Sequence, residues 1–307
     1  MPAGTPHARN VGSAPASIAL EETWQPPITP ELFRKFQQLI HQESGIWLGD
    51  AKTALLCGRL SRRLRARAVP TFDRYYKLVL EPDQREERVA MIDAITTNET
   101  RFFREPKQFE YLERRVIPRW KAEAEHGLRS KTVRLWSAGC SSGEEPYSLA
   151  MLAGTHLTAD RGWKVTILAT DISTRMLDRA RAGIYRMEKS ADIAPSFLKS
   201  CMLKGIDDQE GNMKVMPEIR QMVEFQRLNL MHDPYPEGIR FDAIFCRNVL
   251  IYFDPVSKGK IVERLTDSLQ HGGLLFFGQA ETLSGMNSKL RTLGPSVCTR
   301  SGDQSAL

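Results

Sequence analysis

The chain has 307 residues, of which 41% are hydrophobic and 26% charged, and its formal net charge is +6. This length is enough for two domains with a sizeable core, and the composition excludes a fibrous or largely disordered protein. No apolar run approaches the roughly 18 residues of a membrane span, and no hydrophobic signal segment is present, so we expect a cytoplasmic protein without membrane insertion.

The five cysteines are odd in number, scattered along the chain and without any C-x-x-C spacing. The six histidines show no metal-ligand spacing. We therefore expect free thiols, with neither a disulfide framework nor a metal site.

The first part of the chain has helical patterns after an irregular start. Residues 1–27 are rich in small residues and proline, which predicts a disordered N-terminal extension. Thr29 and Pro30 are typical of a helix start, apolar residues follow at helical spacing, and Gly45 is typical of a helix end. Further helical patterns at 72–80 and 85–95 predict an all-helical domain over 28–120, followed by a charged linker at 121–131.

The positive charge is concentrated in residues 51–70, which contain six basic and no acidic residues. Leucines recur there every four residues as a stripe to be buried, and a row of basic side chains lies beside them on the same helix. This row predicts an acidic partner surface, although a solvated face without a partner and a phosphate-binding face stay open. Its members are Lys52, Arg59 and Arg63, with Arg62 pointing further out.

From residue 133 onward, short β-rich runs alternate with helical stretches, which is typical of a doubly wound parallel sheet. We place this α/β domain at 132–290 and a C-terminal tail at 291–307. The predicted strands are 133–137, 165–170, 223–228, 241–246 and 274–278.

The second and third predicted strands are separated by more residues than one crossover helix needs. A helix at 173–182 supplies the crossover, which leaves about 183–222 as an inserted subdomain. Its turn residues favour a small β-hairpin element. Partner docking and a structural excursion without a role are both compatible with it.

The loop after the first strand contains Gly139, Ser141 and Gly143, which allow close approach of the backbone to a ligand. It is neither a dinucleotide fingerprint nor a P-loop, and Glu144 and Glu145 place negative charge where a pyrophosphate would bind. A cofactor with ribose hydroxyls, an ammonium and a sulfonium suits these carboxylates, which indicates S-adenosylmethionine. An ordinary strand-to-helix turn with acidic residues near the helix dipole is the alternative.

Ligands of open α/β sheets bind at the carboxyl ends of the strands, and each predicted strand end carries suitable residues. Asp171 follows the second strand, where it can accept hydrogen bonds from ribose hydroxyls or cap the next helix. Asn229 and Leu230 follow the third strand and can bracket an adenine. The fourth strand is followed by the segment 247–254.

Together these segments resemble the chemotaxis receptor methyltransferases, which transfer methyl groups from S-adenosylmethionine to receptor glutamates. The resemblance runs from about residue 29 to about residue 283. It rests, in family order, on Thr97–Glu105 (TNETRFFRE), Trp136–Ser148, Ala169–Ser173, Phe241–Asp254 and Gly278–Thr282. It implies a helical N-terminal domain, a doubly wound methyltransferase domain and a small β-subdomain inserted in it. One departure is Glu99, which is charged where an apolar or small residue is expected, and we expect it to face solvent.

The resemblance also implies site residues. It implies cofactor contacts at Asn98, Thr100, Arg104, Glu145, Asp171, Asn229, Leu230, Asn248 and Val249. The loop after the first strand adds Gly139, and of its two glutamates we prefer Glu145 to Glu144 as the cofactor contact. Arg104, neutralised by a carboxylate, is the expected charged positioner of the reaction, and Tyr252 is the candidate that lines the methyl site or else a core aromatic.

As partners, the resemblance implies the acidic methylation helices of chemoreceptors, contacted by Lys52, Arg59, Arg62 and Arg63. A receptor tail peptide on the inserted subdomain is a further expectation. So are a monomer, recruitment to membrane receptor arrays, and S-adenosylhomocysteine as the product.

Two other functions are compatible with parts of the sequence. A nucleic-acid methyltransferase would use the same cofactor and the basic helix, but it predicts an Asp/Asn-Pro-Pro-aromatic site after the fourth strand, where this chain has Arg247-Asn248-Val249-Leu250. A non-catalytic cofactor-binding signalling module is the second alternative, against which Arg104 and Tyr252 speak.

Overall fold

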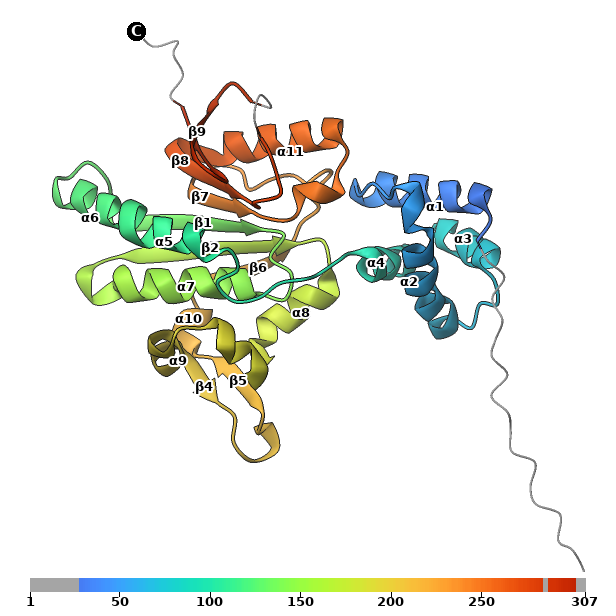
Figure 1. The fold of residues 1–307 in the computed structure, drawn as a ribbon, viewed down its shortest axis with the longest axis horizontal. Helices are drawn as coiled ribbons and strands as arrows, with labels where there is room; N and C mark the ends of the chain where they lie inside the picture. Colours follow the sequence, from blue (N-terminus) through green and yellow to red (C-terminus); the bar gives the residue numbers. More distant parts are fainter. Residues whose placement is uncertain (1–27, 284–286, 302–307) are drawn as a thin grey trace, which may run out of the picture.

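The computed structural model describes residues 28–283 and 287–301 (Figure 1). The predicted extension at 1–27 and the last residues of the predicted tail lie outside these ranges. Within them, a helical unit stands beside a mixed sheet, and a small subdomain projects from the sheet domain (Figure 1). The predicted fold class, an α/β methyltransferase-type sheet with a helical N-terminal domain and an inserted β-subdomain, is confirmed.

The helical domain begins and ends its first helix where the caps predict. The Thr29 hydroxyl accepts a hydrogen bond from the Leu32 N–H at 3.2 Å, and Gly45 ends the helix with a φ of 77°. Leu56, Leu60 and Leu64 are fully buried in the core of this domain, as the stripe predicts. The elements are α1 (Pro30–Ser44), η1 (Asp50–Lys52), α2 (Thr53–Ala66), α3 (Phe72–Leu80) and α4 (Arg85–Ile95).

The main sheet has the order β6-β2-β1-β7-β8-β10-β9 within the described residues. The first five strands of this order are parallel to one another. At the β8 edge, β10 pairs antiparallel with β8, and β9 pairs antiparallel with β10. Along β1, Val133 and Leu135 pack into one buried cluster and Trp136 and Ala138 into another, because successive side chains point to opposite faces. The strands are β1 (Thr132–Ala138), β2 (Lys164–Asp171), β6 (Val223–Arg227), β7 (Phe241–Cys246), β8 (Leu269–Phe277), β9 (Leu290–Gly294) and β10 (Val297–Arg300).

Helices cover both faces of this sheet, and its carboxyl edge is open toward the helical domain (Figure 1). The helical segments of the sheet domain, short connecting turns included, are α5 (Pro106–Tyr111), η2 (Leu112–Val116), α6 (Ile117–Glu125), α7 (Glu144–His156), η3 (Ala159–Arg161), α8 (Thr174–Ala182), η6 (Leu250–Tyr252) and α11 (Pro255–Ser268).

Three predicted boundaries are corrected. Phe109, Leu112 and Trp120 of α5–α6 are buried against the sheet, so the helical domain ends near residue 96 instead of 120. Residues 121–125, predicted as linker, complete α6, whose charged residues occupy its more exposed face. The predicted tail contains β9 and β10, and β10 buries Val297 and Cys298 against the core clusters.

The inserted subdomain runs from β3 to α10, residues 184–220, close to the predicted range of 183–222. Its antiparallel sheet has the order β3-β5-β4, so the predicted hairpin gains a third strand. The elements are β3 (Ile184–Arg186), η4 (Met187–Asp192), α9 (Pro195–Cys201), β4 (Met202–Lys204), η5 (Asp207–Gln209), β5 (Asn212–Val215) and α10 (Pro217–Arg220).

Candidate active site

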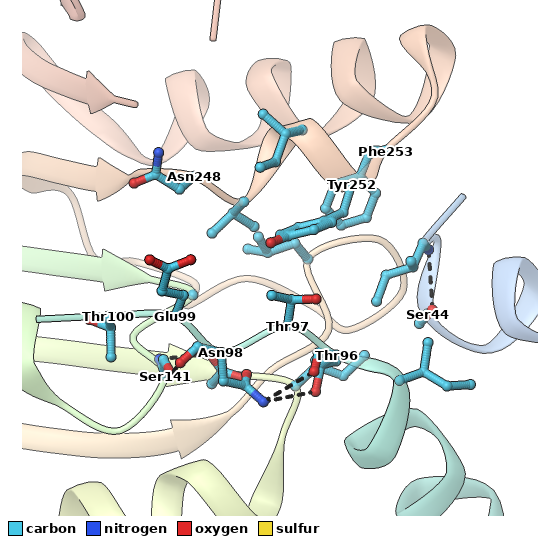
Figure 2. Close-up of a pocket in the computed structure, with 18 of the residues that line it drawn as sticks. Ser44, Thr96, Thr97, Asn98, Glu99, Thr100, Ser141, Asn248, Tyr252 and Phe253 are labelled. Atoms are coloured by element: carbon cyan, nitrogen blue, oxygen red, sulfur yellow. Dashed lines mark hydrogen bonds between the residues drawn. The ribbon is translucent and has the colours of Figure 1, made fainter. Parts of the chain in front are cut away.

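A cavity of about 230 Å³ lies between the helical domain and the carboxyl ends of the parallel strands. Figure 2 shows one wall made by Asn248, Tyr252 and Phe253 and the other by Thr96–Thr100. Residues from six separate segments of the chain therefore meet in one pocket. The sequence-predicted residues that line it are Lys52, Asn98, Thr100, Arg104, Gly139, Glu145, Asp171, Asn229, Leu230, Asn248, Val249 and Tyr252.

The loop after β1 is held by Asp171 at the end of β2. One oxygen of its carboxyl group accepts a hydrogen bond from the Ser141 N–H at 2.8 Å, and the other accepts one from the Ser173 N–H at 2.8 Å. Burial raises the pKa of Asp171, and these backbone donors oppose the rise. The cap of α8 is Ser173, so Asp171 supports the helix start without being its cap.

Gly139 allows the loop to pass close to the opposite wall. Its φ is 89°, and a Cβ at this position would collide with the Val249 side chain. Ser141 and Asn248, which also line the pocket, have φ values of 49° and 56°. Such left-handed conformations at non-glycine residues are strained and gather at ligand sites.

Glu145 lies in the pocket next to Arg247, a residue for which the sequence suggested no role. The Arg247 guanidinium is 3.3 Å from the Glu145 carboxylate and 3.7 Å from that of Glu105, and its side chain is 2% exposed. Burial raises the pKa of Glu145, whereas Arg247 and a hydrogen bond from Ser137 at 2.7 Å lower it. The sequence contains one signal for Arg247: it is a charged residue that directly follows the predicted strand 241–246, all six residues of which are buried.

The sequence offers both Glu144 and Glu145 as cofactor residues, with Glu145 preferred, and the structure separates the two. Glu144 is fully buried but does not line the pocket. Its carboxylate pairs with Lys189 of the inserted subdomain and accepts a hydrogen bond from the Ser142 hydroxyl at 2.7 Å. Of the two adjacent glutamates, only Glu145 lines the cavity.

Arg104 and Tyr252 both line the pocket, so Tyr252 is not a core aromatic. The Arg104 guanidinium donates to the Glu99 carbonyl oxygen at 2.8 Å, and its charge also lowers the pKa of Glu145. Glu99 is exposed, as expected, at the cavity wall. The Lys52 ammonium lies 5.9 Å from the centre of the Tyr252 ring, a cation–π distance.

The asparagines of the pocket tie segments together. Asn229 donates to the Glu43 carbonyl oxygen at 2.9 Å and so links the strand end to α1. The Asn248 N–H donates to the carboxylate of Glu281 at 3.1 Å. Glu281 also accepts hydrogen bonds from the Gly278 and Ile251 N–H groups. The motif Gly278–Thr282 contains this residue but did not indicate its role.

Two family models match almost all of the described chain. The one described as "CheR methyltransferase, SAM binding domain" matches residues 98–298, and "CheR methyltransferase, all-alpha domain" matches residues 31–96. The chain belongs to the CheR methyltransferase family. The boundary between the two matches agrees with the corrected end of the helical domain.

Curated CheR relatives are similar over nearly their full length. Proteins named "Chemotaxis protein methyltransferase" are 39% identical in Escherichia coli over 94% of this chain and 96% of the relative, and 38% identical in Salmonella typhimurium over 95% and 98%. A solved Rickettsia typhi structure, "PKMT2 … in complex with AdoHcy", is 20% identical over 48% of this chain and 21% of its own, with a TM-score of 0.30. That likeness is too weak to bear on function.

As a CheR protein, the chain is an S-adenosylmethionine-dependent methyltransferase, and the pocket chemistry fits this cofactor. The buried carboxyl groups of Glu145 and Asp171 suit hydroxyl and ammonium groups, and they disfavour a pyrophosphate. The Arg247 side chain, which also lines the pocket, keeps its positive charge beside Glu145 and so offsets part of the negative charge at this wall.

The basic row of this CheR chain is partly used inside the protein. Arg63 forms two hydrogen bonds with the buried Glu87, at 2.9 and 2.6 Å, and Arg59 donates to the Ile95 carbonyl oxygen. Arg62 is exposed, as predicted. Arg63 is therefore neutralised by Glu87 and serves the core of the helical domain, whereas Arg59 keeps its positive charge.

Two findings about the described ranges complete the site. None of their helices has the length and apolarity that crossing a bilayer requires. No group of three or more His, Cys, Asp or Glu side chains in these ranges is arranged to hold a metal ion.

Proposed function

We propose that this chain methylates glutamate side chains on the cytoplasmic helices of chemoreceptors, the methyl-accepting chemotaxis proteins. The products are glutamate methyl esters and S-adenosylhomocysteine, and the reaction serves sensory adaptation. One observation carries the proposal: the pocket combines buried carboxyls for the cofactor with the cations Lys52 and Arg104, and none of its described lining residues is His or Cys. This is the arrangement that an acceptor needs when it is already an anion.

The acceptor explains why no general base is needed. A glutamate with a pKa of about 4.3 is ionised at neutral pH and is itself the nucleophile. S-adenosylmethionine supplies the electrophilic methyl group. Catalysis then depends on alignment and exclusion of water, which can contribute roughly 7 to 11 kcal/mol.

We assign these tasks to residues on two walls of the pocket. Glu145 and Asp171 hold the polar groups of the cofactor, helped by Asn98, Thr100, Gly139, Asn229, Leu230, Asn248 and Val249. Arg104 positions a carboxylate by a charge-assisted hydrogen bond. The Tyr252 ring and hydroxyl orient the acceptor beside the methyl group.

For receptor docking we propose the exposed side of α2 together with Lys52, the last residue of η1. Lys52 and Arg62, supported by Arg59, face acidic residues of the receptor helices, whereas Arg63 acts through its pairing with Glu87. We further propose that the edge strand β4 of the inserted subdomain accepts an extended receptor tail, because an edge strand has unpaired backbone groups. The enzyme then works as a cytoplasmic monomer recruited to membrane receptor arrays.

The proposal is tested by transfer of labelled methyl from S-adenosylmethionine to receptor-containing membranes from the same source, followed by mild alkali. Alkali releases methanol from carboxyl methyl esters. A receptor-sized band whose label is lost in alkali is the expected result. Alkali-stable label would indicate an N-methyltransferase, including one acting on nucleic acid, and cofactor binding without transfer would indicate a signalling module.

A further inference from the structure

The inserted subdomain contacts the cofactor loop, residues 139–145, at residues 142–144. Lys189 on η4 forms an ion pair with the fully buried Glu144, the first residue of α7. The Tyr185 hydroxyl on β3 donates to the Ser142 carbonyl oxygen at 2.8 Å. Between them, Gly143 is so tightly enclosed that an added Cβ would lie 2.9 Å from that hydroxyl.

The same subdomain also contacts the second segment that lines the cofactor pocket. The rings of Phe102 and Tyr185 meet edge to face with centroids 4.9 Å apart, and Phe103 stacks on Phe197 of α9 at 5.2 Å. Aromatic pairs of this kind fix the relative orientation of the elements that carry them. The adjacent residues Asn98, Thr100 and Arg104 lie in the pocket.

Glu144 and Glu145 are neighbours in the first turn of α7 and point in different directions. Glu144 is 0% exposed and faces Lys189, whereas Glu145 lines the pocket. A buried carboxylate without its cation is strongly unfavourable, so the helix start would rearrange to hydrate Glu144 if Lys189 were lost. Any such movement would displace Glu145.

We propose that the inserted subdomain is a supporting element of the cofactor pocket, in which Lys189 and Tyr185 are positioning residues that fix the loop 139–145. Cofactor affinity and the conformation of the subdomain are therefore linked, and the linkage is reciprocal. The proposal does not depend on the acceptor, because it concerns only how the pocket is held before any methyl transfer.

The first test measures S-adenosylhomocysteine binding by calorimetry, without receptor, for Lys189→Met, Lys189→Arg and Lys199→Met. We expect Lys189→Met to raise the Kd by roughly 5- to 150-fold, the usual range of coupling between sites. Lys189→Arg retains the ion pair and should bind nearly as the wild type. Lys199 is an exposed lysine on α9 of the same subdomain, so its variant should not change the Kd.

The thermal midpoint of each protein separates positioning from mere stability. A Lys189→Met protein that melts earlier but binds S-adenosylhomocysteine as the wild type does would overturn the proposal. Glu144→Gln in the same background should recover part of the affinity, because it removes the uncompensated charge.

If Lys189→Met does not fold, amide hydrogen exchange of the wild-type protein tests the linkage between the cofactor pocket and the subdomain. We expect saturating S-adenosylhomocysteine to slow exchange at Tyr185–Asp192, although this segment does not line the pocket. Unchanged exchange there, with slowing confined to the pocket segments, would refute the linkage. Methyl transfer is not needed for either readout, so failure of this inference is distinct from failure of the proposed function.

Discussion

Replacing Arg247 by methionine tests whether this residue neutralises the buried carboxylates of the pocket. In the native protein its guanidinium lies between Glu145 and Glu105, donates to the Arg104 carbonyl oxygen, and is 5.5 Å from the centre of the Phe109 ring. The two carboxylates are only 14% and 12% exposed. Methionine would keep much of the packing volume and remove the charge.

Removing one partner of a buried ion pair costs about 3 to 5 kcal/mol, because the other charge remains buried and uncompensated. We expect a loss of this size in the free energy of unfolding of the Arg247→Met protein, measured in urea by circular dichroism. The Tm should fall by roughly 6 to 20 °C, at about 2 to 4 °C per kcal/mol for a domain of this size.

The pH dependence separates lost charge pairing from lost packing. Burial already raises the pKa of Glu145, and without Arg247 it rises further. An unpaired carboxyl destabilises the native state only while it is ionised. The stability difference between wild type and variant should therefore be largest near neutral pH and shrink as the pH falls through the raised pKa toward 4.5, the ordinary value.

A difference that does not change with pH would refute this reasoning and assign the effect to packing on Phe109. Two matched variants complete the experiment. Arg247→Lys retains a positive charge and should lose less stability than Arg247→Met. The double variant with Glu145→Gln should recover part of the loss, since one of the two unpaired charges is gone.

Three further predictions concern the pocket loop, cofactor binding and the docking face. Gly139→Ala should lower the free energy of unfolding by about 1 to 3 kcal/mol in urea, because its left-handed backbone and the opposite wall leave no place for a Cβ; an unchanged value would be inconsistent with the loop geometry. Burial raises the pKa values of Glu145 and Asp171, and a bound ammonium should lower them, so S-adenosylhomocysteine binding should release protons and strengthen as the pH rises through these raised pKa values. Calorimetric enthalpies that do not vary between buffers of different ionisation enthalpy would contradict this. Arg62→Glu should raise the KM for receptor several-fold, by charge reversal at the docking face, and leave the S-adenosylhomocysteine Kd nearly unchanged, because Arg62 is exposed and does not line the pocket; Lys107→Glu, an exposed control on α5, should alter neither.

Local signals predicted the elements that local interactions determine. The first helix follows its caps at Thr29 and Gly45, and α3 and α4 begin and end as their patterns predict. Residues 106–120 were assigned to the wrong domain and residues 121–125 to a linker, because a helical segment does not show in its own sequence what covers its buried face. Strand β9 escaped prediction since its residues are mostly exposed, without an apolar alternation.

The pocket itself was largely predictable, since the ends of parallel strands must meet at one edge. The choice between Glu144 and Glu145 was not. Successive helical residues differ by about 100° in direction, so only one of the pair can face the pocket, and which one depends on where Lys189 lies 45 residues along the chain. The pairing of Arg63 with Glu87 could not be predicted either, because the two residues are 24 positions apart in the chain.

The helical domain is part of the pocket as well as a candidate docking surface. Its residue Ile46 forms an antiparallel bridge with Phe253, and the Trp47 N–H donates to the Tyr252 carbonyl oxygen at 2.8 Å. Next to them, Asp254 caps α11 and binds His41 of α1 at 3.0 Å. Tyr252 is therefore held by backbone contacts from the domain that carries Lys52. A receptor helix bound on α2 would meet the cofactor pocket across this junction, so docking and alignment of the acceptor depend on the same contacts.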